Sequence, residues 1–446
     1  MNTRCIILDI VGLQPHHITP STAPALASVL ETVVPMKPSF PALTVPAQTT
    51  LATGSPPSDH GDVASGEYDR ATSSVAFWER DRGNRTRLWE RAREQGHTTG
   101  ALFFQHLIGS TADVAITPAP IEDADNNLIE MNCWTNPDDF YETLREKLGH
   151  FPLHAYWGPG ASRASSEWIL DATAISIQRF DPDLLWVYLP HLDYAGLKNG
   201  PGEELAEAVS EIDTLVAELL STLKARSRWE KTAITVVSEY GFQSVDTPVY
   251  PNRTLRDAGL LSLTEDSSGG TEVDFENSQA FAMVDHQIAH IYASLDSIPD
   301  AKAALAQLDG VETVVEAGDD SPYAINHPNA GELLAIANSN AWFQYYWWET
   351  ATDAPGYARQ MDIHAKPGFD PCELFLSDDG RISLDASRVG GSHGRTDRET
   401  WPVFGIGGPA LYNRTLELPD PMDAQHVVPT IETLLGTRPE LDSTHE

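Results

Sequence analysis

Three acidic residues stand at or just beyond the ends of strand-like apolar runs. They are Asp9 in CIILDIVG (5–12), Asp193 in LLWVYLPHLDY (184–194) and Glu239 directly after TAITVVS (232–238). The carboxyl ends of parallel strands meet at one edge of a sheet, where ligands bind. Carboxylates gathered there repel one another unless a cation lies between them, so the pattern indicates a metal site. A single acid at a strand end is more often a turn former or helix cap, and spacing alone leaves both interpretations open.

Several histidines could complete such a site, because imidazole and carboxylate groups are common metal ligands. His191 stands two residues before Asp193, and the two side chains share a face if the strand extends through both. His393 lies in GGSHGRTD, where small residues let the backbone approach a ligand closely. His286 and His364 are weaker candidates for lining the site. Packing in the core or a place in a loop is the alternative for each histidine.

The elements that must position these side chains alternate between strand-like and helix-like over the first 250 residues. Further buried strands are predicted at 98–105 and 232–237. Apolar residues at steps of three and four over 204–223 predict an amphipathic helix. Strand, helix and strand at this spacing form a right-handed βαβ crossover. The sequence therefore predicts an α/β fold with a mostly parallel central sheet and helices on both faces.

The pattern changes near residue 250, where short mixed elements predict a small α+β unit. We expect a core of residues 1–249 and 331–446, interrupted by a cap or insertion over 250–330. Residues 331–347 return to apolar, strand-like runs and are assigned to the core. The segment 423–436 predicts a closing helix.

The composition bounds the partners of the chain. The formal net charge of −36 disfavours binding to a nucleic-acid duplex, which depends on neutralising phosphates with Lys and Arg. An anionic substrate would need a local source of positive charge, such as bound cations. No run of about 18 apolar residues predicts a membrane span. The start of the chain lacks the features of a signal peptide, and three scattered cysteines fit a reducing, cytoplasmic setting.

One segment carries a resemblance to a known family. SFPALTVPAQTTLATGSPPSDHG (39–61) resembles the nucleophile segment of the type I phosphodiesterase/nucleotide pyrophosphatase group in the alkaline phosphatase superfamily. In that group a Thr precedes an x-Pro dipeptide and opens a helix, and TG, a Pro and HG follow. The matching residues here are Thr44-Val45-Pro46, Thr53-Gly54, Pro57 and His60-Gly61. LDIVGL, LPHLDYAGLKNGP, VVSEYGF, GSHG and VVPTIETLLG resemble further family segments in the same order.

The resemblance implies an alkaline-phosphatase-like core and a two-metal hydrolase with Thr44 as nucleophile. The expected substrate is a small phosphate ester, phosphodiester, pyrophosphate or phosphonate. The metals are usually zinc, with Mn²⁺ or Mg²⁺ as alternatives. By position, the nucleophile-side metal site would use Asp9, Thr44, Glu239 and Tyr240, and the other site would use Asp193 and His393.

The chain departs from the family pattern at the places where polar groups are expected. Glu239-Tyr240 stands where the family has Asp-His, Leu197 stands where it has a His, and Ser65 takes the place of an Asn that binds phosphoryl oxygen. His191 is the candidate replacement for the ligand lost at Leu197. Ser65 keeps one hydrogen-bond donor.

Tyr240 has two candidate roles. We expect a neutral donor to a phosphoryl oxygen, because a phenol with a pKa near 10 is mostly protonated at neutral pH; an unusual metal ligand is the alternative. These departures also leave open a family member that binds a phosphorylated metabolite without turnover. A sulfatase-like or phosphate-shuffling enzyme of the superfamily is a third, weaker hypothesis.

Overall fold

The computed structural model describes residues 3–77, 85–122, 128–266, 269–363, 365–412 and 416–437. His364, one of the weaker site candidates, lies outside the described residues. Within the described part of the chain, no helix is both long and apolar enough to cross a membrane. The three cysteines, Cys5, Cys133 and Cys372, are buried and unpaired.

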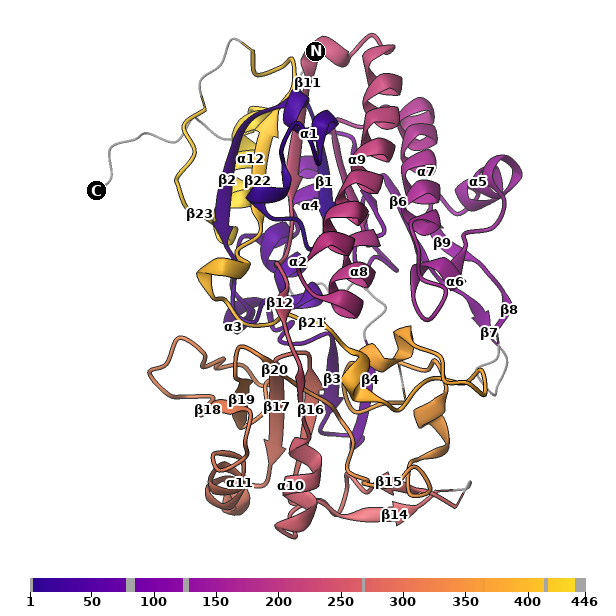
Figure 1. Cartoon of the computed structure of the whole chain (residues 1–446). Coiled ribbons are helices and arrows are strands. Elements are labelled where there is room, and N and C mark those ends of the chain that lie inside the picture. The colour runs from indigo at the N-terminus through magenta and orange to yellow at the C-terminus, as the bar shows by residue number, and fades with distance from the viewer. Residues whose placement is uncertain are drawn as a thin grey trace.

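The main sheet of the described chain has nine strands in the order β23-β2-β22-β11-β1-β10-β5-β6-β9 (Figure 1). Their bounds are β1 Arg4–Ile10, β2 Leu30–Lys37, β5 Thr99–Leu102, β6 Val114–Pro118, β9 Cys133–Asn136, β10 Leu184–Leu189, β11 Thr232–Val237, β22 Val403–Gly407 and β23 Met422–Asp423. Strands β11, β1, β10, β5 and β6 are parallel to one another. Only β22 and β9 pair antiparallel with their neighbours in these residues. The predicted mostly parallel sheet is confirmed.

Helices cover both faces of this sheet. Ile6, Leu8 and Ile10 of β1 pack into one apolar core, and Cys5 and Ile7 pack into the other, as the alternation of a strand requires. The first core is closed by α1 (Pro24–Val29), α5 (Phe140–Leu148), α7 (Ala164–Phe180), α8 (His191–Asn199) and α9 (Glu203–Lys224), and the second by α2 (Thr44–Thr53), α4 (Leu88–Glu94) and α12 (Val427–Leu435). Burial on both faces explains why these strands read as continuous apolar runs.

A smaller unit lies below the main sheet in Figure 1. It is built on an antiparallel sheet in the order β16-β17-β19-β18, with α10 (Pro251–Asp257) and α11 (Ile298–Leu305) packed against it. The strands are β16 Ala280–Asp285, β17 Ile288–Ala293, β18 Val311–Glu316 and β19 Leu333–Ala337. The short elements of the described chain are α3 Pro57–His60, α6 Leu153–Tyr156, β3 Gly66–Asp69, β4 Ser74–Phe77, β7 Ile121–Glu122, β8 Leu128–Glu130, β12 Gln243–Ser244, β13 Thr247–Val249, β14 Leu263–Glu265, β15 Thr271–Val273, β20 Ala341–Phe343 and β21 Gly391–Ser392.

The assignment of residues 331–347 to the main core differs from the structure. β19 pairs with β17 and β18 of the smaller sheet, and β20 pairs with β13, which also lies beside that unit. An apolar run predicts that a strand is buried but contains no information about which sheet buries it. Strand pairing thus extends the smaller unit beyond residue 330, at least to Phe343.

The aromatic run AWFQYYWW (341–348) forms much of the core of the smaller unit. Phe343, Tyr345 and Trp347 are fully buried. We expect Phe343→Ala to lower the free energy of unfolding by about 3–5 kcal/mol, because it deletes a buried ring and leaves a cavity. Urea denaturation would measure the change. Leu295→Ala, at a side chain that is 82% exposed, is the matched control and should change it by less than about 0.5 kcal/mol. Equal effects of the two substitutions would contradict the prediction.

Candidate active site

Asp9 and Glu239 meet at the carboxyl edge of neighbouring strands. β1 and β11 are parallel, with Asp9 opposite Val237, two residues before Glu239. Both carboxyl groups are buried and interact directly. Trp186 Nε1 donates to Asp9 Oδ2 at 3.1 Å, and Gln48 Nε2 donates to Glu239 Oε1 at 2.8 Å. Asp9 Oδ1 and Glu239 Oε2 have no hydrogen-bond partner.

The environment of this pair disfavours two free negative charges. Burial raises the pKa of Asp9 to about 7. Burial, with the neighbouring Asp9 carboxylate as the second cause, raises the pKa of Glu239 well above its usual range. A divalent cation between the unpartnered oxygens would remove that penalty, and hard cations such as Mg²⁺ are commonly held by one or two carboxylates. The donors present therefore fit one cation at Asp9 and Glu239.

Thr44 is the first residue of α2 and is half-buried. Its Oγ1 lies 2.8 Å from the hydroxyl oxygen of Tyr240. One turn later on the same helix, Gln48 holds Glu239, so α2 places Thr44 on the side of the carboxylate pair. The first backbone N–H groups of a helix have no partner within it and attract anions. Thr44 thus combines a hydroxyl group with an anion-binding helix end.

Asp193 and His393, predicted for a second metal, lie around Tyr240. The Tyr240 hydroxyl donates to Asp193 Oδ1 at 3.1 Å, and the Tyr240 and His393 rings are stacked with centroids 3.5 Å apart. His393 Nδ1 contacts the carbonyl oxygen of Ala42 at 3.0 Å, and its Nε2 has no partner. In this structure the Tyr240 hydroxyl donates to Asp193, and its expected role as a donor to a phosphoryl oxygen stays a prediction.

The strand does not extend to His191 and Asp193, so the two side chains do not share a strand face as predicted. β10 ends at Leu189 and α8 begins at His191, so the two residues are on a helix and point about 200° apart. His191 Nε2 instead contacts Glu211 Oε2 on α9 at 2.6 Å. Leu197, one turn after Asp193, is buried in the apolar core. The predicted second site thus keeps two donors, Asp193 and His393, and no third His, Cys, Asp or Glu of the described residues joins them.

The smaller unit contributes residues that sequence reasoning ranked low or missed. His286 sits in the turn between β16 and β17 with φ of 57°, a strained conformation for a residue other than glycine. Its buried ring lies 3.8 Å from that of His393 and 4.3 Å from that of Phe369. Asp285, beside it, was not predicted. Its Oδ2 accepts the backbone N–H of Ser65 at 2.8 Å.

Gln48 and Asp285, which were not predicted, each had a signal in the sequence. Gln48 follows Thr44 at helical spacing, which places both on one face of α2. Asp285-His286 stands at the end of an apolar strand, as Asp9 and Glu239 do, but the strand belongs to another sheet. Ser65 is engaged by Asp285 through both its amide and its hydroxyl. Its expected role as a donor to phosphoryl oxygen stays a prediction.

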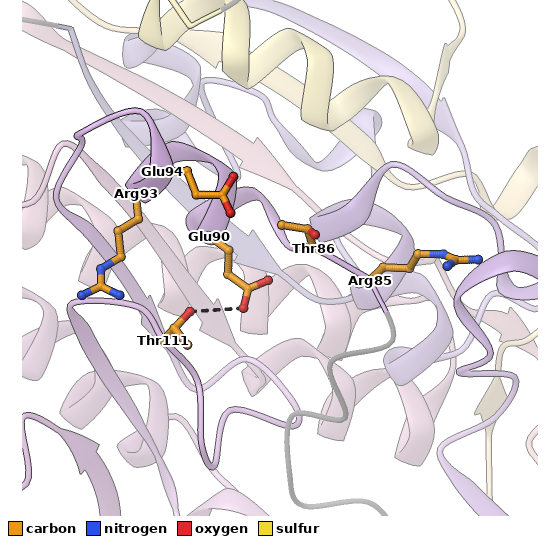
Figure 2. Close-up of a pocket in the computed structure, with 6 residues that line it drawn as sticks. All are labelled: Arg85, Thr86, Glu90, Arg93, Glu94 and Thr111. Carbon is orange, nitrogen blue, oxygen red and sulfur yellow. Dashed lines mark hydrogen bonds between the residues drawn. The ribbon is translucent and has the colours of Figure 1, made fainter.

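A surface pocket of about 670 Å³ lies apart from these side chains. Figure 2 shows its lining residues, with Thr111 donating to Glu90 at 3.1 Å and the Arg85 and Arg93 side chains pointing away from each other. Those two cationic groups do not converge on one ligand. The pocket shares no residue with the cluster around Thr44.

Comparisons with known proteins identify a family and a shared fold. A family model described as type I phosphodiesterase/nucleotide pyrophosphatase matches residues 5–370. An uncharacterized pyrophosphatase/phosphodiesterase of Schizosaccharomyces pombe is 25% identical over 254 residues, which cover 56% of this chain and 46% of the relative. The chain thus spans less than half the length of that relative.

Solved structures share the fold over nearly the whole chain. An inactive variant of murine ectonucleotide pyrophosphatase/phosphodiesterase 5, in complex with AMP, matches with a TM-score of 0.60 and 16% identity, covering 100% of this chain and 97% of that one. Phosphonoacetate hydrolase from Sinorhizobium meliloti, in complex with phosphonoacetate, matches with a TM-score of 0.63 and 15% identity, covering 97% and 96%.

We expect Asp285 to make the free energy of unfolding decrease as the pH rises from about 4 to about 6. Burial raises the pKa of Asp285 to about 6, against about 3.9 in an unfolded chain. The folded state therefore binds more protons in this window, and ionisation costs up to about 3 kcal/mol by about pH 7. Asp285→Asn keeps an acceptor for Ser65 but cannot ionise, so it should lose less stability over this range.

Urea denaturation at about pH 4.5 and about pH 7 would measure the difference between the variant and the wild-type chain. The other buried carboxyl groups are common to both proteins and cancel in this comparison. Asp296→Asn, at an exposed carboxylate of the same unit, is the control. An Asp285→Asn variant with the pH dependence of the wild-type chain would contradict the prediction.

Proposed function

Because the chain belongs to the type I phosphodiesterase/nucleotide pyrophosphatase family, we propose that it hydrolyses a phosphate ester, phosphodiester, pyrophosphate or phosphonate with Thr44 as nucleophile. The placement of Thr44 carries this proposal. Its hydroxyl lies at the N-terminus of α2, within 2.8 Å of the Tyr240 hydroxyl, and Gln48 on the same helix holds Glu239. The proposed nucleophile Thr44 thus lies at a helix end that attracts anions, on the same helix that holds one acid of the Asp9–Glu239 pair.

In the proposed reaction, Thr44 Oγ1 gives up its proton to solvent and attacks phosphorus while the bond from phosphorus to the leaving group breaks. The leaving group departs with the electron pair and takes a proton from solvent. Water then attacks the phosphothreonine and releases the phosphoryl group, restoring the Thr44 hydroxyl. The N-terminal N–H groups of α2 bind the phosphoryl oxygens, since a helix N-terminus favours negative charge. Positioning and charge neutralisation dominate such transfers.

We propose that Asp9 and Glu239 hold a divalent cation next to Thr44. Bound there, the cation would lower the pKa of the Thr44 hydroxyl and neutralise phosphoryl charge. The donor oxygens favour Mg²⁺ or Mn²⁺, because carboxylate oxygens suit these ions and zinc prefers nitrogen and sulfur ligands. Zinc, which the resemblance implies, would have to be bound by oxygen atoms here.

The substrate we propose is a small molecule with a phosphoryl or phosphonyl group. AMP and phosphonoacetate, named with the two structural neighbours, are examples of this class. We also place the protein in the cytoplasm, which its three unpaired, buried cysteines support.

Ligand binding without turnover is the second candidate function. It is favoured by the absence, among the described residues, of any group of three His, Cys, Asp or Glu side chains that could hold a metal. Leu197 also replaces a family ligand. Isothermal titration with AMP separates the two functions, because binding without any product over several hours would support the second.

We expect Thr44→Ala to reduce hydrolysis of nitrophenyl phosphate esters by at least about 100-fold, because it removes the attacking hydroxyl. Rates would be measured with Mg²⁺, Mn²⁺ or Zn²⁺ added. Thr44→Ser keeps a hydroxyl and should retain more activity than Thr44→Ala. Thr72→Ala, at an exposed threonine, is the control. Wild-type protein no more active than Thr44→Ala would sink the proposed reaction.

A further inference from the structure

Tyr240 joins two groups that come from separate elements of the main unit. Its hydroxyl oxygen lies 2.8 Å from Thr44 Oγ1 at the start of α2 and 3.1 Å from Asp193 Oδ1 in the first turn of α8. The Tyr240 side chain is 1% exposed. These distances make one continuous chain of hydrogen bonds from Thr44 through Tyr240 to Asp193.

The direction of each hydrogen bond in this chain follows from counting protons. A phenol carries one proton, and Tyr240 donates it to the carboxyl oxygen of Asp193. When Asp193 is ionised, the contact with Thr44 runs the other way, with the threonine hydroxyl as donor and the Tyr240 oxygen as acceptor. The Thr44 hydroxyl then points its proton at the Tyr240 oxygen, and the lone pairs of Oγ1 point away from Tyr240.

The packing around the Tyr240 ring holds it in this position. His393 stacks on one face, with ring planes 7° apart, and Phe242 meets both rings edge-on at 5.8 Å. Gly196 of α8 admits Phe242, since a Cβ there would come within 2.2 Å of that ring. A ring confined on these sides cannot swing away without disturbing α8.

Tyr240 competes with a second cation for Asp193. Asp193 and His393 are the residues that would hold it, and Tyr240 is bonded to the first and stacked on the second. Leu197, one turn after Asp193, offers no donor, and His191 is bound to Glu211. A cation bound at Asp193 Oδ1 would therefore have to displace the Tyr240 hydroxyl, which leaves His393 Nε2 as the one unpartnered donor that the described residues offer on this side.

We infer that the Tyr240 hydroxyl replaces a second cation, so that the chain binds one divalent ion, at Asp9 and Glu239, and positions Thr44 through Tyr240 and Asp193. This inference rests on the proposed function. Tyr240 is a positioning residue: it accepts the Thr44 proton in a hydrogen bond and fixes the orientation of Oγ1. Asp193 in turn fixes the orientation of Tyr240.

The number of bound ions tests the inference without any turnover. Metal-free wild-type protein would be titrated with Mn²⁺ by calorimetry, and its metal content measured after dialysis. We expect one ion per chain; two ions or none would overturn the inference. Tyr240→His combined with Leu197→His supplies two ligands and should bind two ions. A folded double variant that still binds one ion would refute the role given to Tyr240 and Leu197. If the double variant does not fold, the number of ions bound by the wild-type chain decides the inference.

Tyr240→Phe tests the positioning role. It removes the hydroxyl but keeps the ring on His393, so we expect one bound ion, an unchanged KM and a kcat lowered by about 10- to 100-fold. Tyr345→Phe is the control, because the Tyr345 hydroxyl is also buried but has no hydrogen-bond partner. Unchanged kcat in Tyr240→Phe would overturn this role. The activity of Thr44→Ala tests the proposed reaction separately, because the number of bound ions can be measured without catalysis.

Discussion

The contact between the Asp9 and Glu239 carboxyl groups is the constraint on which the site depends. It follows from the parallel pairing of β1 and β11, which brings the two acids to one edge of the sheet. Trp186 and Gln48 satisfy one oxygen of each acid and leave the other oxygen of each without a partner. Two buried acids in contact are unfavourable when both are ionised, so the same sheet register that builds the fold creates a demand for positive charge.

The smaller unit is joined to this site as well as lying beside it. Asp285 accepts a hydrogen bond from Ser65, and the Gln287 N–H donates to the His393 carbonyl oxygen at 3.0 Å, so the β16–β17 turn is bonded to two loops of the main unit. Lys366, Asp370 and Glu373 form a fully buried ion cluster, and Trp157 of the main unit donates to Glu373 at 2.7 Å. Phe369, which lies between Lys366 and Asp370 in the sequence, packs its ring against that of His286. The smaller unit thus forms one wall of the site.

The sequence predicts the parts of this molecule that depend on local pattern. The run 232–237, the helix period over 204–223 and the Thr-x-Pro start of α2 all appear as elements at the predicted places. The sequence does not predict which sheet buries residues 331–347, because pairing partners are distant in the chain. It also misplaces His191, since the end of a strand and the start of a helix differ there by a single residue, Pro190.

Tyr240 shows why the site was harder to predict than the fold. The family pattern shows that the phenol of Tyr240 stands in place of an imidazole. The role of that phenol depends on its distances to Thr44 and Asp193, which lie 196 and 47 residues away in sequence. The same limit applies to His286, whose ring reaches His393 only because the strained β16–β17 turn points it there.

Charge explains why a single cation can still matter in such a site. The formal net charge is −36, so the protein as a whole repels an anionic substrate. Two cationic side chains near the site in sequence are already neutralised: Arg395 by Asp397 and Glu312, and Lys366 by its two buried acids. Replacing a second cation with the neutral Tyr240 hydroxyl would orient Thr44 without contributing positive charge. The N-terminus of α2 and one ion at Asp9 and Glu239 must then supply most of the attraction for a phosphoryl group, and removing that ion should weaken substrate binding as well as catalysis.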